Sequence, residues 1–371
     1  AGLFIGTGIG VAFMSKGLLE PALIIVLAAL MPVFKPWRTW NYGLCLLLAA
    51  VVATPWLGIW PYALHLRAPE LFTLWLSQQS FFGNDELTYF VEILPWFAWP
   101  ALPLALWALW FHARRSKLSD PAIQLGLAAF SVFIIGLSLG SESRDVDALP
   151  LLLPLTLLAT AAVDTLQRGA ASALDWFGKM TFGLIAVLLW AVWLVMAVRG
   201  APVSIVAEYT SLSHDFVYRF QPLAFFAALI LSLAWILCIT RARRSNLRAV
   251  TDWALGLTLC WGLLTTLWLP WLDHGKSYRP VFQALRDALP NRGQCVSSKG
   301  LGKAQRALVE YYAELVTQRV ETVGDIACGL LLVQSNTRNA ETSPGPGWRK
   351  IWEGKRPGDT VERYMLFQKT A

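Results

Sequence analysis

The sequence predicts an all-α polytopic membrane bundle followed by a small soluble α/β domain. Hydrophobic residues make up 56% of the 371 residues and charged residues only 15%, far from the balance of a soluble domain. Apolar stretches long enough to cross a bilayer, which takes roughly 20 residues per helix, recur up to residue 272. The segment 273–371 lacks such stretches and gains charge, Gly and Pro. We therefore expect a transmembrane domain at 1–272 and an extracytoplasmic domain at 273–371.

Nine apolar stretches are expected to be membrane helices. They lie at 1–14, 18–34, 42–65, 91–111, 122–140, 148–166, 180–198, 223–240 and 250–272. The first stretch looks cut short, because the chain starts at Ala1 without a Met, a basic segment or a small-residue cleavage site. We interpret this start as lying inside a helix of an N-terminally truncated domain, not in a signal peptide.

Basic residues predict the orientation of the bundle, since Lys and Arg in short loops stay on the cytoplasmic side. Five lie in the loops expected to face outward, and eleven lie in the alternate loops 35–41, 112–121, 167–179 and 241–249. The C-terminal domain then faces outward, into the periplasm if the chain comes from a bacterial inner membrane. Cytoplasmic anchors beside anionic lipid explain the net charge of +7, so no nucleic-acid partner is expected.

The C-terminal domain shows strand and helix patterns at short spacing. Apolar segments typical of strands lie at 293–298, 328–335, 348–354 and 362–369, and an amphipathic helix is expected at 302–315. Cys295 and Cys328 fall on two of these strands, where an oxidising compartment allows them to form a disulfide. No C-x-x-C or H-x-x-x-H spacing occurs, so neither a metal site nor a cofactor is predicted.

Glycines and a lysine distinguish the first two apolar stretches. Gly2, Gly6 and Gly10 stand four apart, a spacing typical of close packing between membrane helices. Lys16 interrupts the apolar sequence in "FMSKGLLEP", where the orientation places an outward turn. One interpretation is that Lys16 snorkels at the interface with its ammonium in water. The other is that Lys16 faces an outward cavity and meets an anion, with Glu20 as a counter-charge or a sugar contact.

Arg144 lies in a second outward turn, "SESRDVDALPLLLPL", beside Asp145 and Asp147. Two isolated cations at the outer ends of helices suit one phosphate group, because Arg supplies a bidentate fork and Lys a point charge. We therefore predict that Lys16 and Arg144 bind a lipid phosphate.

Three motifs together resemble a known family. "FMSKG" resembles the F-L-T-K-G turn of the integral-membrane glycosyltransferases related to aminoarabinose transferase and the protein O-mannosyltransferases. "TPWLGIWPYALHLRAPE" (54–70) resembles their P-W segment before an outer loop, and "SRDVDALPLLLPLTLLA" (143–159) resembles their S-x-R-x-x-Y-x-x-P-x-x-P pattern. The motifs occur in the order and on the side of the membrane that the family shows, and together with the C-terminal α/β segment the resemblance covers most of the chain.

The resemblance implies a C-type glycosyltransferase fold, with the nine stretches matching the last nine of about thirteen membrane helices. It also implies an inverting enzyme that moves a sugar from a polyprenyl-phosphate carrier to a lipid, glycan or protein acceptor. The catalytic carboxylate is expected upstream of Ala1, so this sequence alone is expected to be inactive. Asp147 is a possible sugar or acceptor contact, but the family pattern usually has an aromatic residue there, and this puts the family's sugar or lipid contact at that position in doubt.

Further contacts to sugar or acceptor are expected in the outer loop 66–90. Asp85 and Glu86, with nearby Gln and Asn side chains, offer hydrogen bonds, and the Leu, Phe and Trp residues can form an interfacial helix. The alternative is a solvated loop whose aromatic residues only anchor it at the interface.

Two other functional classes stay open. A transporter or lipid flippase would also be helical, with charged or broken-helix positions near the bilayer midplane and often a repeat in two halves. No internal repeat is visible, and the candidate cations lie at outer helix ends. A non-catalytic subunit of an envelope complex would need no phosphate site.

Overall fold

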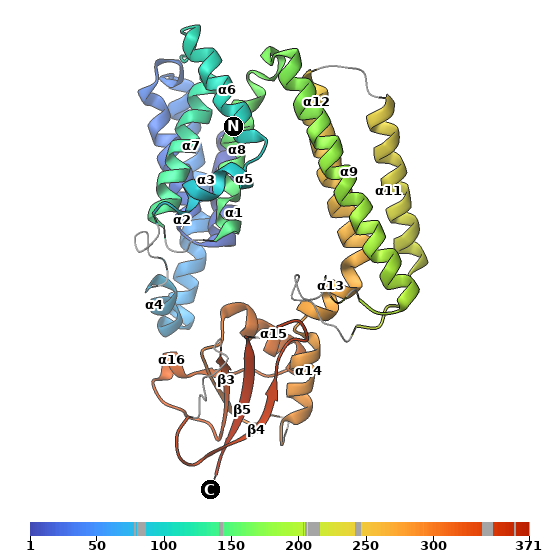
Figure 1. Cartoon of the computed structure of the whole chain (residues 1–371). Helices are drawn as coiled ribbons and strands as arrows, with labels where there is room; N and C mark the ends of the chain where they lie inside the picture. Colours follow the sequence, from blue (N-terminus) through green and yellow to red (C-terminus); the bar gives the residue numbers. More distant parts are fainter. Residues whose placement is uncertain are drawn as a thin grey trace. The chain divides into compact units, whose positions relative to one another are not determined.

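The computed structural model describes the chain except for residues 78, 80–86, 141–143, 203, 205, 207–215, 242–245, 292, 336–343, 360 and 371. The chain divides into two compact units, Ala1–Gln167 and Arg168–Ala371. Both are built mainly of helices, and the second also contains a five-stranded sheet (Figure 1). The expected domain boundary at residue 272 lies inside the second unit and stays a prediction.

Helices are the only regular secondary structure among the described residues of the first unit. Its helices are α1 (Gly2–Lys16), α2 (Leu19–Leu30), α3 (Trp40–Arg67), α4 (Pro69–Ser77), α5 (Tyr89–Phe97), α6 (Ala101–Arg114), α7 (Pro121–Leu139) and α8 (Leu149–Thr160), with short 3-10 helices η1 (Met31–Val33), η2 (Lys35–Trp37), η3 (Asp145–Ala148) and η4 (Val163–Thr165). Helix α8 packs against α6 and α7. Its Leu151, Leu155 and Leu158 lie in the core of the unit together with Phe90 of α5.

The glycine face of α1 packs directly on α3, as its spacing predicts. A Cβ added at Gly6 would lie 2.6 Å from the carbonyl oxygen of Ala49, and one at Gly2 would lie 2.6 Å from that of Cys45. Only glycine leaves room for two helix backbones at this distance. The predicted packing role of these glycines is therefore confirmed.

The second unit begins with membrane-type helices. These are α9 (Arg168–Arg199), α11 (Pro222–Arg241), α12 (Asn246–Leu263), the π-helical η5 (Leu264–Trp268) and α13 (Leu269–Lys276). Helix α12 packs against both α9 and α11. Large side chains such as Trp193, Met196, Trp268 and Trp271 fill the space between the helices.

The remaining residues of the second unit form an α/β domain. Its elements are α14 (Arg279–Ala288), β1 (Val296–Lys299), α15 (Lys303–Ala313), β2 (Gln318–Arg319), α16 (Val320–Val323), β3 (Leu330–Ser335), β4 (Trp348–Gly354) and β5 (Arg363–Lys369). The strand order is β2-β1-β3-β5-β4, in which β1 runs parallel to β2 and β3, and β5 antiparallel to β3 and β4. The four predicted strands and the predicted helix are confirmed, whereas β2, α14 and α16 were not expected.

Five helical segments of the described residues are long and apolar enough to cross a membrane. They are α3, α7, α9, α11 and the run Leu247–Ala288. Helices α5 and α6 make a sixth candidate, bent by 97°. Helices α1 and α2 are shorter, and the stretch expected at 148–166 is divided between α8 and η4. The count of nine therefore stays a prediction, while the helical membrane architecture is confirmed.

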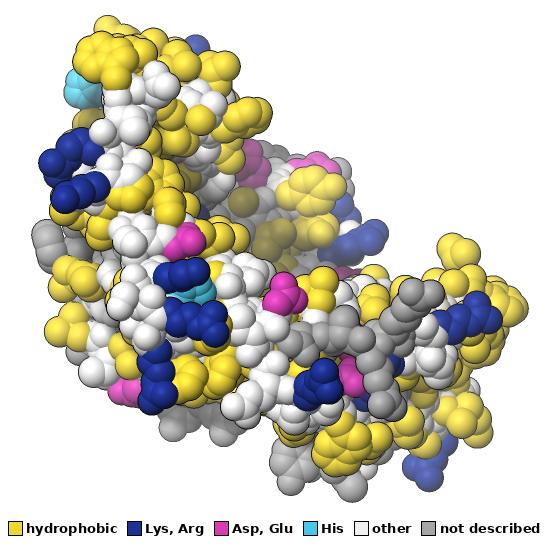
Figure 2. Space-filling view, turned by 90° about the horizontal axis from the view of Figure 1, so that it is seen from above, with side chains coloured by type: hydrophobic (Ala, Val, Ile, Leu, Met, Phe, Trp, Pro, Cys, Tyr) yellow, Lys and Arg dark blue, Asp and Glu magenta, His cyan; other side chains and the backbone are white. Residues whose placement is uncertain are grey.

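The surface composition agrees with an integral membrane protein. Hydrophobic side chains occupy much of the visible surface, and charged side chains lie in scattered small groups (Figure 2). Phe4 on α1 is 83% exposed and Leu223 on α11 is 85% exposed. Such extensive apolar exposure is unfavourable in water but matches lipid, in which the helices satisfy their own backbone groups.

Candidate functional site

Lys16 lies at the junction of α1 and α2. Helix α1 ends there because Gly17 adopts φ +90°, a conformation that side chains with a Cβ rarely adopt, and its N–H still bonds the Phe13 carbonyl. Helix α2 begins two residues later and carries Glu20 in its first turn. The local sequence "KGLLE" thus places an ammonium and a carboxylate on the same sharp turn.

The Lys16 ammonium contacts two carboxylates from different parts of the first unit. Lys16 Nζ donates to Asp147 Oδ1 in a close ion pair, and its distance to Glu20 Oε1 is 3.6 Å. Asp147 is 131 residues away in the sequence, on η3. The structure therefore brings together three of the predicted site residues. The ammonium is held by two carboxylates and does not extend alone toward lipid.

The turn η3 positions the second predicted cation. Arg144 precedes η3 in an extended conformation, and its carbonyl accepts a hydrogen bond of 3.0 Å from the Asp147 amide. Asp145 faces another way and accepts a hydrogen bond of 2.7 Å from the Tyr89 hydroxyl of α5. Arg144 is therefore one 3-10 turn from the residue that contacts Lys16. Tyr89, which anchors this turn, was not predicted, because nothing in its local sequence indicates a partner at residue 145.

The loop 66–90, which is expected to face outward, contains the short helix α4. Trp75 contacts Trp60 of α3 and Phe13 of α1 edge to face, with ring centroids 5.2 and 6.2 Å apart. Beyond α4, the Gln79 side chain accepts a hydrogen bond from the Leu18 amide. Asp85 and Glu86 lie outside the described residues, so their predicted contacts stay predictions.

A second charged cluster lies between α9 and α12 and was missed in the sequence. Asp252 of α12 is only 3% exposed, and its Oδ2 lies 3.0 Å from Lys179 Nζ and 3.3 Å from Arg248 Nε. Lys179 also pairs with Asp175 at 2.6 Å. The signal was the repeated i,i+4 spacing of opposite charges within otherwise apolar helices. Its four members balance in charge, which suits burial between membrane helices.

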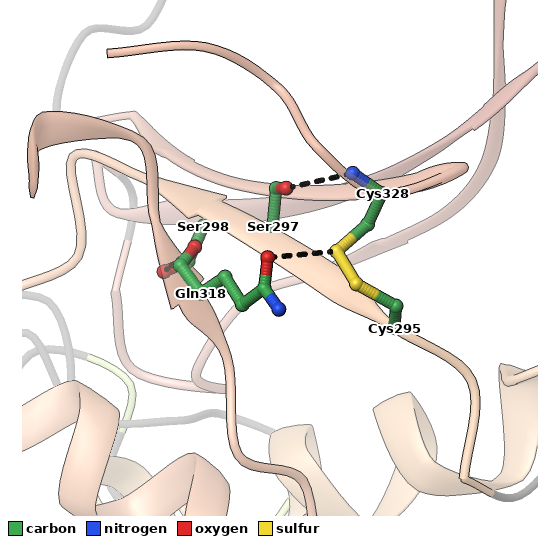
Figure 3. The surroundings of a disulfide bond; sticks show 5 residues. All are labelled: Cys295, Ser297, Ser298, Gln318 and Cys328. Carbon is green, nitrogen blue, oxygen red and sulfur yellow. Dashed lines mark hydrogen bonds between the residues drawn. A yellow bond between two sulfur atoms is a disulfide. The ribbon is translucent and has the colours of Figure 1, made fainter. Parts of the chain in front are cut away.

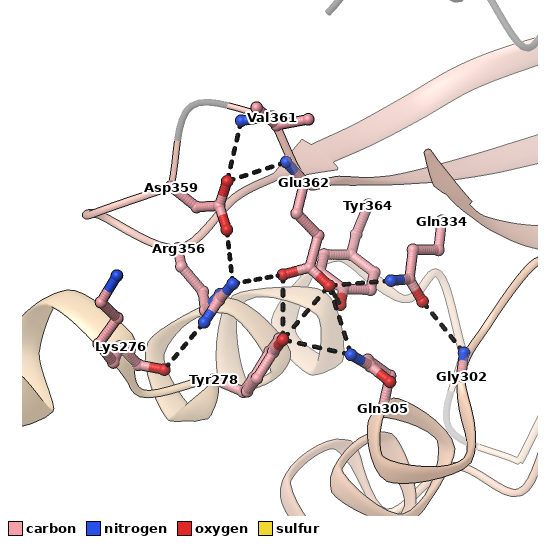
Figure 4. A network of polar contacts seen from close by, with 10 residues as sticks. All are labelled: Lys276, Tyr278, Gly302, Gln305, Gln334, Arg356, Asp359, Val361, Glu362 and Tyr364. Atoms are coloured by element: carbon pink, nitrogen blue, oxygen red, sulfur yellow. Dashed lines mark hydrogen bonds and ion pairs between the residues drawn. The ribbon is translucent and has the colours of Figure 1, made fainter. Parts of the chain in front are cut away.

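The α/β domain contains a polar network around Glu362 (Figure 4). Glu362 Oε1 accepts hydrogen bonds from Tyr364 at 2.6 Å and Gln334 at 2.8 Å, while Oε2 pairs with Arg356 at 2.9 Å. The Tyr278 hydroxyl donates to the same carboxylate, 3.0 Å from Oε2. Glu362 is 8% exposed, so these donors stabilise a nearly buried charge.

The network shifts the pKa values of several of its members, among them Tyr364 and Asp359. Burial and the neighbouring Glu362 carboxylate raise the pKa of Tyr364, which keeps its hydroxyl protonated as a donor. Burial alone would raise the pKa of Asp359. The amides of Glu362 and Val361 and the Arg356 guanidinium outweigh this effect and hold the pKa below its usual range. The network thus stabilises the turn between β4 and β5, and no group in it is arranged as a free acid or base.

Cys295 and Cys328 are joined by a disulfide, with their Cα atoms 5.3 Å apart (Figure 3). Gln318 Oε1 contacts Cys328 Sγ at 3.5 Å, and the Cys328 amide donates to Ser297 Oγ at 3.3 Å. The bridge ties the segment before β1 to the segment before β3. Among the described residues, no group of three or more His, Cys, Asp or Glu is arranged to hold a metal ion.

Comparison with known proteins gives matches among solved structures. No protein-family model and no curated protein matches the sequence. The crystal structure of ArnT from Cupriavidus metallidurans bound to undecaprenyl phosphate matches with a TM-score of 0.53 and 15% identity, over 98% of this chain and 68% of that chain. ArnT from the same organism in the apo state matches with a TM-score of 0.55 and 14% identity, over the same shares. The resemblance inferred from the motifs is thus confirmed at the level of the fold: this chain has the fold of ArnT over nearly its whole length.

Proposed function

We propose that the protein is a glycosyltransferase that takes a sugar from a polyprenyl-phosphate carrier and passes it to a lipid, glycan or protein acceptor on the outer face of the membrane. The observation that carries the proposal is the match in fold, over 98% of the chain, to an ArnT structure that holds undecaprenyl phosphate. The motifs around Lys16 and Arg144 support it independently, because they resemble the same enzymes in sequence.

In this proposal Lys16 and Arg144 bind the carrier phosphate. The acceptor hydroxyl forms a new bond to the anomeric carbon, the bond from that carbon to the phosphate oxygen breaks, and its electron pair leaves with the phosphate. A carboxylate takes the hydroxyl proton. Lys16 and Arg144 would stabilise the charge that develops on the leaving phosphate. Attack from the face opposite the phosphate inverts the anomeric centre. No carboxylate of this chain is assigned as the base.

The ion pairs of Lys16 bear directly on how a phosphate would bind. Asp147 and Glu20 both contact the Lys16 ammonium. A phosphate would have to displace at least one of them or share the ammonium with them. The Lys16 side chain is 39% exposed, so an incoming anion can reach it. We therefore propose that the two carboxylates hold Lys16 in place until the carrier arrives.

A transporter or flippase is the second candidate, and one observation favours it. Helices α5 and α6 form a pair bent by 97°, which is one candidate for a broken membrane span. Transporters often contain such broken helices. Movement of undecaprenyl phosphate across liposomes without sugar transfer would support this candidate.

The test uses the full-length protein in liposomes. Binding of undecaprenyl phosphate and transfer from undecaprenyl-phosphate-linked sugars are compared for wild type, Lys16→Gln and Arg144→Gln. Each variant removes a charge-assisted contact worth about 1.5–3 kcal/mol, so we expect losses of about tenfold or more in affinity or rate. Lys35→Gln and Arg115→Gln are matched controls at exposed positions expected to face the cytoplasm, and they should retain wild-type values. Wild-type binding and transfer in both site variants would contradict the proposal.

A further inference from the structure

The turn between α1 and α2 leaves a backbone donor that its own residues do not satisfy. Leu18 is the N-cap of α2 and has no side chain that can accept a hydrogen bond. Its amide instead donates to Gln79 Oε1 at 3.0 Å, across 61 residues of sequence. A side chain that lies just after α4, within the loop 66–90, therefore completes the turn that carries Lys16.

Gly17 and Gln79 fit each other closely. A Cβ at Gly17 would lie 2.3 Å from Gln79 Oε1, well inside van der Waals contact. Gly17 also has φ +90°, which glycine adopts without strain. The space beside Gly17 is thus filled by the same oxygen that accepts the Leu18 amide, so the turn and the Gln79 side chain constrain one another.

The backbone of Gln79 is attached to α4. The backbone N–H of Gln79 donates to the Leu76 carbonyl at 3.0 Å, at the end of this helix. Helix α4 is anchored by Trp75 against Trp60 and Phe13, and by Phe72 against His65 at a ring distance of 5.1 Å. Aromatic contacts of this kind favour one docked position. Gln79 is therefore fixed relative to both α1 and α3.

From these contacts we propose that Gln79 is a positioning residue for the Lys16 ammonium. Gln79 holds the Gly17–Leu18 turn, and this turn determines the direction of the last residue of α1 relative to α2. In this arrangement Lys16 reaches Glu20 and Asp147. The assignment rests on the proposed function, in which Lys16 binds the carrier phosphate. It gives Gln79 a role other than the sugar contact expected of the amide side chains in the loop 66–90.

The test is a double-mutant cycle on the full-length protein in detergent, with undecaprenyl phosphate as the probe. Gln79→Met keeps the length of the side chain but removes the acceptor oxygen. We expect it to weaken binding about fivefold, the effect of one neutral hydrogen bond. In a Lys16→Gln background the same substitution should have no further effect, because Gln79 acts through Lys16. Thr73→Val is the control on α4, since within the described residues the Thr73 hydroxyl donates only to the Glu70 carbonyl of its own helix.

The outcomes separate this assignment from the proposed function. Wild-type affinity in Gln79→Met, with a loss in Lys16→Gln, would overturn the positioning role alone. Equal losses from Gln79→Met with and without Lys16 would show an independent contact and would also overturn it. A loss that accompanies a fall in melting temperature, and that Thr73→Val shares, would show a general role in docking α4 and would overturn the positioning role. Lack of undecaprenyl phosphate binding by the wild type would overturn the proposed function and this assignment with it. Because the probe carries no sugar, a sugar contact cannot produce the expected result.

Discussion

At the scale of single residues, the environment of Lys16 matters most. The ammonium contacts two carboxylates, so the cluster of Lys16, Glu20 and Asp147 carries more negative than positive charge at neutral pH. A phosphate anion approaching Lys16 would therefore be repelled by the same groups that hold the lysine in place. The affinity for the phosphate therefore depends on the free energy needed to break these ion pairs.

This competition predicts an unusual substitution effect. Asp147→Asn should tighten binding of undecaprenyl phosphate by about two- to fivefold, because a partly exposed ion pair contributes up to about 1 kcal/mol. Asp145→Asn is the matched control, since it removes the same charge from η3 but faces Tyr89 and not Lys16. It should change the affinity less. Weaker binding by Asp147→Asn would show that Asp147 orients Lys16 for the phosphate and does not compete with it.

At the scale of elements, close packing and one covalent bond define the local architecture. The glycine face of α1 brings its backbone against α3, which places the end of α1 beside the docked helix α4. In the α/β domain, the disulfide joins the segments leading into β1 and β3, which are already paired in parallel. The buried side chains of β3, including Leu331 and Leu332, supply the core on both faces of the sheet.

Removal of the disulfide should destabilise the α/β domain. The bond joins two cysteines that lie 33 positions apart in the sequence. The chain-entropy model gives a stabilisation of about 3 to 4 kcal/mol for closing a loop of this size. In a Cys295→Ser/Cys328→Ser variant we expect faster hydrogen exchange of peptides from β1 and β3. Cys238→Ser, at an exposed free cysteine of α11, should leave this exchange unchanged. Alkylation of the denatured wild type without a reductant should modify three of the five cysteines. Modification of all five would contradict the bond.

At the scale of the whole molecule, the distribution of basic residues predicts which loops face the cytoplasm. The loops 35–41, 112–121, 167–179 and 241–249 carry most of the Lys and Arg that lie between the apolar stretches. This orientation would place Lys16, Arg144 and the α/β domain on the outer side. The proposed reaction requires Lys16 and Arg144 to be on the same side of the membrane.

Labelling of cysteines in intact cells tests the orientation. In a full-length background without the free cysteines Cys45, Cys238 and Cys260, an impermeant maleimide should label Ser343→Cys but neither Ser116→Cys nor Ser245→Cys. Disrupted cells serve as the control, because all three positions should then react. Labelling of Ser116→Cys or Ser245→Cys in intact cells would contradict the predicted orientation and the outward placement of Lys16 and Arg144.

Local sequence patterns alone were sufficient to predict the helical class, the strands of the α/β domain and the packing face of α1. Apolar runs, alternating residues and the four-residue spacing of Gly2, Gly6 and Gly10 act over a few residues, so they can be read without knowing the fold. Lys16 and Arg144 were singled out in the same way, as charges in apolar surroundings. The number of membrane helices was harder to predict, because hydropathy does not show where breaks such as the one between α5 and α6 divide an apolar run.

The sequence by itself determined the kind of protein and the side chains that can carry charge at its helix ends. Only the tertiary structure decided which partners those side chains meet. Asp147 reaches Lys16 across 131 residues, and Gln79 reaches the Leu18 amide across 61. These pairings depend on how α1, α2, α4 and η3 pack against one another. The physical reason is that a hydrogen bond or an ion pair forms only within a few ångströms, and the packing of whole helices sets that separation.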